Sequence, residues 1–405
     1  ALAEVVRRHE SLRTSFVTRG GVPVQVVEEG VVLPLVVVDV EGPESEVRAR
    51  AVVEEEARRR FDLRRGPLVR AVLVRLGAAD HVLVVTVHHI VSDGWSAGVL
   101  VRELCVLYEA FSRGAPSPLP ELAVQYADFA LWQRRRLTGP VLDRLLAYWR
   151  ERLDGATVVD LPTDRPRPPV PSYRGATHRL ELDAVTTEAL RRLCRQEGVT
   201  LFMVLVAAYA VVLARWSGQD DLVIGAPIAN RNRVELEGLI GFFVNTLPLR
   251  LDLSGDPTFA ELLTRVRHST LGAYAHQDLP FDRLVEELHP QRDPTRTTPI
   301  VGSLFHFDAT AVPLPPLADL TTEPWEIDKQ TARTDQTWTL WENEGTIAGV
   351  VEYATDLFDP ETVAAVAEAF TALAGSLAAD PDTELLPISR ALPSRVGPAR
   401  ATGRR

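Results

Sequence analysis

Two adjacent histidines, His88 and His89, are followed after three further residues by Asp93 and Gly94. Histidine is the side chain whose ordinary pKa lies near neutrality, so either ring could accept a proton in a reaction at biological pH. A nearby carboxylate can fix a turn or pair with an arginine, and a glycine leaves room for a ligand beside the backbone. These residue types at this spacing predict a site for acid–base chemistry.

The surrounding sequence predicts how the histidines are presented. The run 82–87 is apolar enough for a strand buried on both faces, with the two histidines at its carboxyl end. Because successive strand residues point to opposite faces, only one histidine can face a given side. An amphipathic helix that ends near Gly114 is predicted next. Its apolar positions are Leu100, Leu104, Leu107, Tyr108 and Phe111.

The second half of the chain has periodicities of its own. Alternating residues predict strands over 177–183 and 222–229, and the turn 343–345 predicts a β-hairpin. The most apolar stretch, 201–214, is too short to cross a bilayer, so we expect a core helix there and no membrane partner. A last helix should begin after the N-cap Asp359. Its buried stripe is expected at Val363, Val366, Phe370, Leu373 and Leu377.

Composition excludes several classes of protein. The chain has 405 residues and a net charge of −11, which argues against a nucleic-acid partner. The glutamates of 54–56 each have an arginine four residues on, a pattern typical of a solvated helix face rather than of a phosphate site. Cys105 and Cys194 are the only cysteines and lie in separate helical patterns, so we expect no disulfide, no metal site and a cytoplasmic location.

Six motifs stand in one order along the chain. The histidine run continues into Trp95 and Ser96. The other five cover residues 8–16, 126–132, 240–246, 276–282 and 292–296. In this order and spacing they resemble the condensation domains of nonribosomal peptide synthetases, and the resemblance covers nearly the whole chain.

The resemblance implies an α/β fold of two chloramphenicol acetyltransferase-like lobes, set as a V-shaped pseudo-dimer with a central substrate tunnel. We expect the N-terminal lobe, with its first strand missing, over 1–163, a proline-rich connector over 164–172, the C-terminal lobe over 173–385 and an interdomain linker tail over 386–405. The connector also follows from the residues themselves, because its prolines cannot continue a helix or lie inside a sheet.

The resemblance also implies peptide-bond formation. The α-amine of an acceptor aminoacyl thioester would attack a donor thioester, with both substrates carried on the phosphopantetheine arms of carrier proteins. An α-amine has a pKa near 8, so a strong base is dispensable. His89 is expected to be the catalytic residue, since the second histidine does the work in this family, and His88 should point away as a supporting residue.

Further site residues follow from the resemblance. Asp93 is expected to pair with an arginine of the other lobe, for which Arg231 is the candidate. Gly94 would leave its N–H open to the developing oxyanion and give the donor thioester room to pass. Trp95 and Asn245 are expected along the substrate tunnel.

The expected partners are an upstream donor and a downstream acceptor carrier protein, together with an adjacent adenylation domain reached through the C-terminal linker. We expect no cofactor or metal bound by the domain itself, and a monomer within a multidomain synthetase. An L-configured donor is favoured by the segment 148–168 and by the Asn245 motif, both of which most resemble that subtype.

Three alternatives remain. Epimerisation domains share the histidine motif but use a glutamate of the second lobe, where this chain reads Gly-Phe-Phe-Val-Asn over 241–245. An acyltransferase of soluble thioesters belongs to a related fold. A non-catalytic recruiting module usually loses a motif histidine or the glycine, and all of them are present here. Cyclisation relatives carry aspartates in place of the histidines, which excludes heterocycle formation.

Overall fold

The computed structural model describes residues 1–288, 300–308, 317, 319–325, 327–382 and 384–385. The chain divides into two compact units. Unit 1 comprises 1–138, 229–244 and 312–329, and unit 2 comprises 139–228, 245–311 and 330–405. The first change of unit comes at Gly139, whereas the N-terminal lobe was expected to extend to residue 163.

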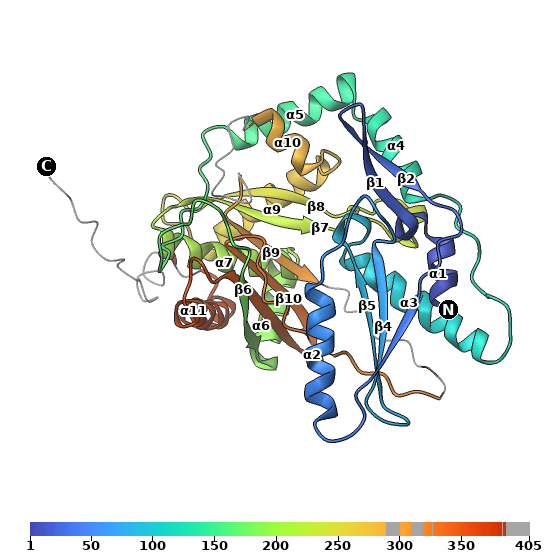
Figure 1. Cartoon of the computed structure of the whole chain (residues 1–405). Coiled ribbons are helices and arrows are strands. Elements are labelled where there is room, and N and C mark those ends of the chain that lie inside the picture. Colours follow the sequence, from blue (N-terminus) through green and yellow to red (C-terminus); the bar gives the residue numbers. More distant parts are fainter. Residues whose placement is uncertain (289–299, 309–316, 318, 326, 383, 386–405) are drawn as a thin grey trace, which may run out of the picture. The chain divides into compact units, whose positions relative to one another are not determined.

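Unit 1 is built on a three-stranded sheet in the order β3-β4-β5 (Figure 1). β3 (Leu35–Asp39) runs parallel to β4 (Val69–Arg75), which runs antiparallel to β5 (His81–Val87). A separate antiparallel hairpin joins β1 (Thr14–Arg19) to β2 (Val22–Val27).

Unit 1 has five helices among the described residues. They are α1 (Leu2–Arg8), α2 (Ser45–Arg58), α3 (Gly94–Ser112), α4 (Tyr126–Arg136) and the short α8 (Val234–Glu237), with 3₁₀ turns η1 (Glu10–Arg13) and η2 (His89–Val91). Of these helices, α2 packs on one face of β4, and α1 and α3 pack on the other. Val72 and Val74 of β4 join the core formed with α2, whereas Val69 and Ala71 join the core formed with α1 and α3. Alternation along β4 thus divides its side chains between two hydrophobic cores.

Two predictions for this region were wrong in detail. β5 lies at the end of the three-stranded sheet, and Leu83 is 43% exposed while Val82 and Val84 are buried, so the strand is not covered on both faces. The predicted helix is present as α3, but Tyr108 and Phe111 are exposed, because the buried residues of the helix end at Leu107.

Unit 2 is built on a six-stranded mixed sheet in the order β6-β11-β10-β9-β7-β8. The strands are β6 (Gly175–Leu182), β7 (Asp221–Ile228), β8 (Asn245–Asp252), β9 (Ser303–Asp308), β10 (Gln336–Asn343) and β11 (Thr346–Ala354). The predicted strands near 177–183 and 222–229 are confirmed. The predicted hairpin is confirmed as well, and Glu344 and Gly345 at its turn have φ of 46° and 95°.

The helices of unit 2 are α5 (Gly139–Leu153), α6 (Ala184–Glu197), α7 (Leu201–Ser217), α9 (Phe259–Ala275), α10 (Phe281–Leu288) and α11 (Pro360–Ala379). α7 is buried along most of its length, and α11 buries the predicted stripe, so both helix predictions are confirmed. By length and composition α11 could cross a membrane, as could α6 and α7 taken together as one bent pair, but half of the most apolar window of α11 is buried inside the protein.

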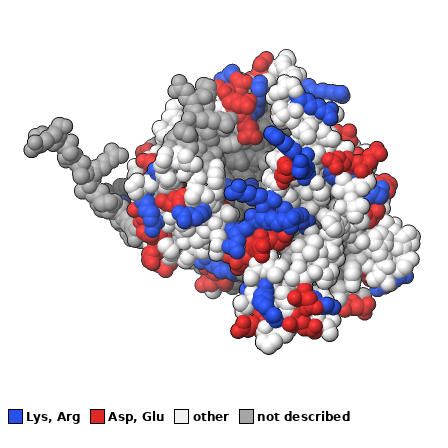
Figure 2. All heavy atoms as spheres, viewed as in Figure 1, with Lys and Arg blue, Asp and Glu red and all other residues white. Residues whose placement is uncertain are grey.

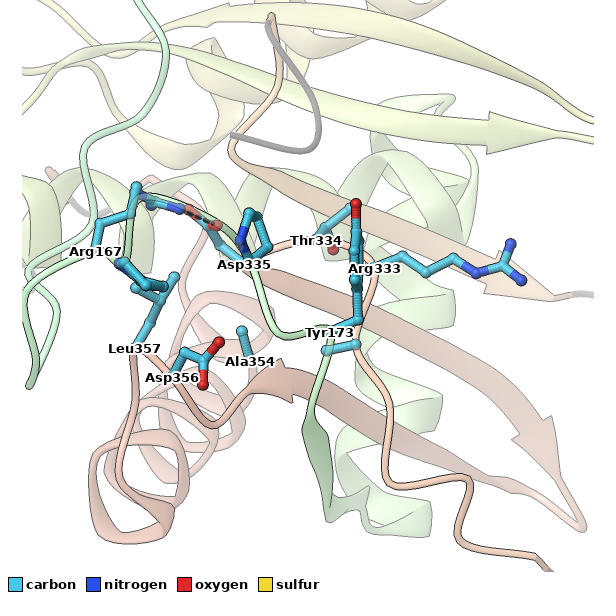
Figure 3. A pocket seen from close by; sticks show the side chains of 11 residues that line it. Arg167, Tyr173, Arg333, Thr334, Asp335, Ala354, Asp356 and Leu357 are labelled. Carbon is cyan, nitrogen blue, oxygen red and sulfur yellow. Dashed lines mark hydrogen bonds and ion pairs between the residues drawn. The ribbon is translucent and has the colours of Figure 1, made fainter. Parts of the chain in front are cut away.

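The connector over 164–172 contains no helix or strand and is fastened to unit 2. The Asp164 carboxylate accepts hydrogen bonds from Asp359 N at 2.8 Å and Thr362 Oγ1 at 2.9 Å. Arg167 Nη1 donates to Asp335 Oδ1 at 2.7 Å, and this ion pair lines a pocket together with Tyr173 (Figure 3). The predicted tail 386–405 and the motif 292–296 lie outside the described residues.

Acidic and basic side chains are interspersed over the face of the molecule in Figure 2. This mixture fits a chain whose 55 acidic residues outnumber its 44 basic residues.

Candidate active site

The histidine run forms a strand–turn–helix junction in unit 1, as the sequence predicted. β5 ends at Val87, η2 carries the chain around the turn, and α3 begins at Gly94. Asp93 is the N-cap of α3, and its carboxylate accepts a hydrogen bond from Ser96 N at 2.8 Å. An aspartate in this position satisfies an amide that has no partner within the helix, which is why the helix begins here.

The ring of His89 is held by two contacts. Its Nδ1 lies 2.6 Å from the carbonyl oxygen of Ser92, and its ring meets Phe242 edge-on with the centroids 5.0 Å apart. A carbonyl oxygen can only accept, so Nδ1 carries the proton in this hydrogen bond and the lone pair of the neutral ring is on Nε2. His89 is therefore oriented with the tautomer that a general base requires.

His88 is oriented differently. Its Nδ1 accepts a hydrogen bond from Ile90 N at 3.0 Å, and its ring meets Phe61 edge-on with the centroids 5.8 Å apart. The neutral ring then carries its proton on Nε2. The two adjacent histidines contact different aromatic residues and use opposite tautomers, in keeping with their alternation at the end of the strand.

The carboxylate of Asp93 accepts five hydrogen bonds. Oδ1 accepts from Ser96 N, from Ser96 Oγ at 2.7 Å and from Arg231 Nη2 at 3.1 Å. Oδ2 accepts from Phe243 N at 2.9 Å and Val244 N at 3.2 Å. The side chain is only 3% exposed. A carboxylate this fully occupied is an anchor for the surrounding backbone rather than a base.

Arg231 is the partner predicted for Asp93, and the ion pair is present. Its Nη1 also donates to the carbonyl oxygens of Leu236 at 2.6 Å and Leu239 at 2.9 Å, and its guanidinium lies 4.0 Å from the centroid of the Phe243 ring. Burial lowers the pKa of Arg231, while the negative charge of Asp93 opposes that shift. Arginine stays charged under these conditions.

The expectation that this arginine belongs to the other lobe was wrong. Arg231 follows β7 of unit 2, but the segment 229–244 leaves that sheet and packs within unit 1. The ion pair therefore closes inside the same compact unit as the histidine run.

Ser96 was missed as a site residue. Its hydroxyl is fully buried and accepts hydrogen bonds from Arg231 Nη2 at 2.8 Å and Gly241 N at 3.0 Å. The hydroxyl donates its one proton to Asp93 Oδ1 at 2.7 Å, and Gly241 O lies 2.9 Å from the same hydroxyl oxygen. The signal available in the sequence was its position three residues after the N-cap Asp93.

A second buried cluster was also missed. Glu103 accepts hydrogen bonds from Arg8 Nε at 3.1 Å and Nη2 at 3.0 Å, and His9 Nε2 lies 2.9 Å from its Oε2. His9 Nδ1 accepts from Ile240 N at 3.3 Å, so the cluster ties α1 and α3 to the segment that carries Phe242. Burial by itself would raise the pKa of Glu103, but the hydrogen bonds from His9 and Arg8 outweigh it and lower the pKa to about 2.

The other predicted residues of unit 1 surround the histidine turn. A Cβ placed on Gly94 would meet no atom within 4 Å, so the space beside it is open. Trp95 is 37% exposed and donates its indole N–H to Glu237 O at 2.8 Å. Tyr126 donates to Phe242 O at 2.8 Å, and burial, followed by the charge of Asp93, raises its pKa to about 12.

Asn245 does not have the surroundings expected of a substrate contact. It is 7% exposed, and its Nδ2 donates to Gln277 O and Leu279 O, both at 2.9 Å. Its Oδ1 accepts from Thr246 N at 3.0 Å and Phe281 N at 2.9 Å. Both donors and both acceptor sites of the amide are used, because the irregular loop 277–281 needs partners for its backbone groups. Asn245 therefore positions a loop of unit 2.

A family model described as "Condensation domain" matches residues 1–390 of the chain. The chain belongs to the condensation domain family. This condensation domain has the mixed α/β fold expected from the sequence, and its histidine turn occupies one of its two units.

The condensation domain is similar to parts of much longer synthetases. It is 45% identical to a linear gramicidin synthase of Brevibacillus parabrevis over 94% of the chain and 5% of that protein. It is 44% identical to phosphinothricin tripeptide synthetase PhsC of Streptomyces viridochromogenes over 95% of the chain and 36% of that protein. The chain thus spans a small part of these relatives.

A solved structure with a similar fold is the X-domain from teicoplanin biosynthesis. It matches with a TM-score of 0.87 and 31% identity, over 95% of this chain and 87% of that one.

Among the described residues of the condensation domain, no group of three or more histidine, cysteine, aspartate or glutamate side chains could hold a metal ion.

Proposed function

We propose that this condensation domain forms a peptide bond by aminolysis of a thioester. The α-amine of an aminoacyl thioester attacks the carbonyl carbon of a donor peptidyl or aminoacyl thioester, and both substrates are carried on phosphopantetheine arms of partner carrier proteins. The observation that carries the proposal is the hydrogen bond from His89 Nδ1 to Ser92 O, which leaves the basic lone pair on Nε2.

The proton balance of the reaction fits a weak base. As the C–N bond forms, the attacking nitrogen becomes positive and the carbonyl oxygen becomes negative. His89 Nε2 accepts the nitrogen's proton, and as the C–S bond breaks the imidazolium returns that proton to the sulfur, which leaves as the thiol of the donor arm. General-base help of this kind contributes about 10²- to 10⁴-fold, and the rest comes from positioning the two substrates.

The oxyanion has a place beside Gly94. This residue is the first of α3, so its N–H lies among the amides without an acceptor inside the helix, and the space beside it is open. Asp93 and Arg231 support the arrangement by fixing the turn, because the Asp93 carboxylate accepts from the Phe243 and Val244 amides and Arg231 Nη1 donates to two carbonyl oxygens of the same segment.

We further propose an L-configured donor, a donor and an acceptor carrier protein as partners, and an adjacent adenylation domain. The many curated relatives that are multidomain synthetases support these partners. The two-lobed V with its tunnel, the cytoplasmic location and the monomeric state stay predictions.

A recruiting module is the second candidate, because the X-domain that this chain resembles is also described in a complex with OxyB. Retention of both histidines, Asp93 and Gly94 in this chain favours catalysis. Epimerisation is the third candidate. Epimerisation would require a second acid–base group, which its relatives supply from a glutamate of the second lobe. This chain has Asn245 at the end of the corresponding stretch, and the donors and acceptors of that amide are already used.

One experiment separates the three functions. The chain is supplied with a peptidyl-loaded donor carrier and an aminoacyl-loaded acceptor carrier in deuterated buffer, and both arms are weighed by mass spectrometry. Condensation predicts elongated peptide on the acceptor arm without deuterium at the donor Cα, and His89→Ala should abolish that product. Deuterium at the Cα without elongation would replace the proposal with epimerisation. Neither signal, with tight carrier binding, would favour the recruiting module.

A further inference from the structure

The loop between α2 and β4 in unit 1 carries three exposed arginines, Arg60, Arg64 and Arg65. Within the part of the chain that the structure describes, their guanidinium groups have no carboxylate or aromatic partner. The one acid of this run is Asp62, whose carboxylate accepts a hydrogen bond from Arg64 N at 3.0 Å. Three arginines and one aspartate leave the run with an excess of two positive charges.

The glutamate–arginine pairs predicted for the end of α2 account for only part of this basic run. Arg58 pairs with Glu54 at 3.3 Å, as the spacing of a solvated helix face predicts. Glu56 is buried instead, and it pairs with Arg70 of β4 and with Arg59 at 3.4 Å. No glutamate of α2 is therefore paired with Arg60 among the described residues.

The loop is held in one conformation by contacts from β1 and β4. Arg70 Nη2 donates to the carbonyl oxygens of Glu56 at 3.1 Å and Arg59 at 2.9 Å, and its guanidinium lies 3.8 Å from the centroid of the Phe61 ring. Phe16 N donates to Leu63 O at 2.7 Å. Because the loop backbone is already fixed, binding would have to order only the arginine side chains.

The same loop adjoins the histidine turn. The Phe61 ring is the edge-on neighbour of His88, and at the end of the loop Leu68 O accepts a hydrogen bond from His88 N at 2.9 Å. The backbone at Leu68, three residues after Arg65, is thus about one strand spacing, roughly 4.8 Å, from the backbone at His88.

We propose that Arg60, Arg64 and Arg65 bind the phosphodiester of a phosphopantetheine arm whose thioester reaches the histidine turn. The inference rests on the proposed function, which brings such arms to His89. A planar guanidinium offers paired N–H donors that match phosphate oxygens. The three arginines lie within six residues, so the cluster is small enough to bind one phosphodiester and too small to cover the extended acidic surface of a partner protein. The rest of the chain is acidic, so this local positive charge would also attract the arm.

The test uses soluble arms that differ only in the phosphate. Binding of phosphopantetheine and of pantetheine to the whole chain is measured by NMR titration, and KM is measured for their aminoacyl thioesters. Wild type should bind the phosphorylated arm about tenfold better, since charge-assisted hydrogen bonds at an exposed site are partly screened. The variant R60Q/R64Q/R65Q should lose that preference, while R19Q/R192Q/R267Q, which removes three exposed arginines from other elements, should keep it.

An unchanged preference in R60Q/R64Q/R65Q would overturn the proposal. So would a weaker affinity for the whole carrier protein with no change in the phosphate preference, because the loop would then recognise the carrier's surface. A third outcome separates this proposal from the proposed function. If the wild type forms no peptide but binds the phosphorylated arm better, and the variant loses that preference, the arm site is upheld and the proposed reaction is refuted.

Discussion

Asp93 and Arg231, 138 residues apart in the chain, form an ion pair at 3.1 Å with both side chains almost completely buried. Both side chains are hydrogen-bonded to Ser96. Arg231 also donates to two carbonyl groups of the segment 229–244, and Asp93 accepts from two amides of the same segment. This pair therefore fastens the segment that carries Phe242 to the turn that carries His89.

We predict that Asp93→Ala and Arg231→Ala each lower the free energy of unfolding by about 3–5 kcal/mol, because either change leaves a buried charge without its partner. The double variant should lose much less than the sum of the two. Urea denaturation of the four proteins in a double-mutant cycle measures this, and additive losses would contradict a coupled pair.

The two histidines should separate activity from stability. His89→Ala is predicted to lower kcat by about 10²- to 10⁴-fold with little change in Tm, because it removes the Nε2 base. His88→Ala should lower Tm more than kcat, because it removes the acceptor for Ile90 N and the contact with Phe61. Equal losses of activity with unchanged Tm in both variants would refute this division.

Gly94→Ala is predicted to leave Tm nearly unchanged, since the added Cβ meets no protein atom within 4 Å. Its turnover should nevertheless fall if the thioester passes beside this backbone. Gly241→Ala is the matched control, because its Cβ would overlap the ring of Tyr126 and should lower Tm instead. Full activity in Gly94→Ala would show that the substrate does not pass beside this residue.

Acid should weaken the protein through Glu103. Its pKa is lowered from the ordinary 4.5 to about 2, so the unfolded chain binds a proton as pH falls below 4.5 while the folded chain does not. The stability that Glu103 contributes is present above pH 4.5 and is lost progressively towards pH 2. Unfolding free energies between these values should fall more steeply for wild type than for Glu103→Gln, and parallel curves would contradict the prediction.

The sequence by itself determined the local structure around the site. The apolar run before His88, the N-cap residue Asp93 and the helical spacing after it act over a few residues, so they predict a strand, a turn and a helix without knowledge of the rest of the fold. The hairpin at Glu344 and Gly345 was predictable for the same reason, since its turn depends on residues that allow positive φ.

Only the tertiary structure decided which distant groups meet. Ser96 became the centre of a buried network because the segment 229–244 packs on α3, and Asn245 became a loop anchor because residues 277–281 lie beside it. The coverage of β5 and the pairing of Glu56 with Arg70 likewise depended on which elements pack together. Burial and hydrogen-bond satisfaction are properties of the packed chain, so the local pattern of residues could not specify them.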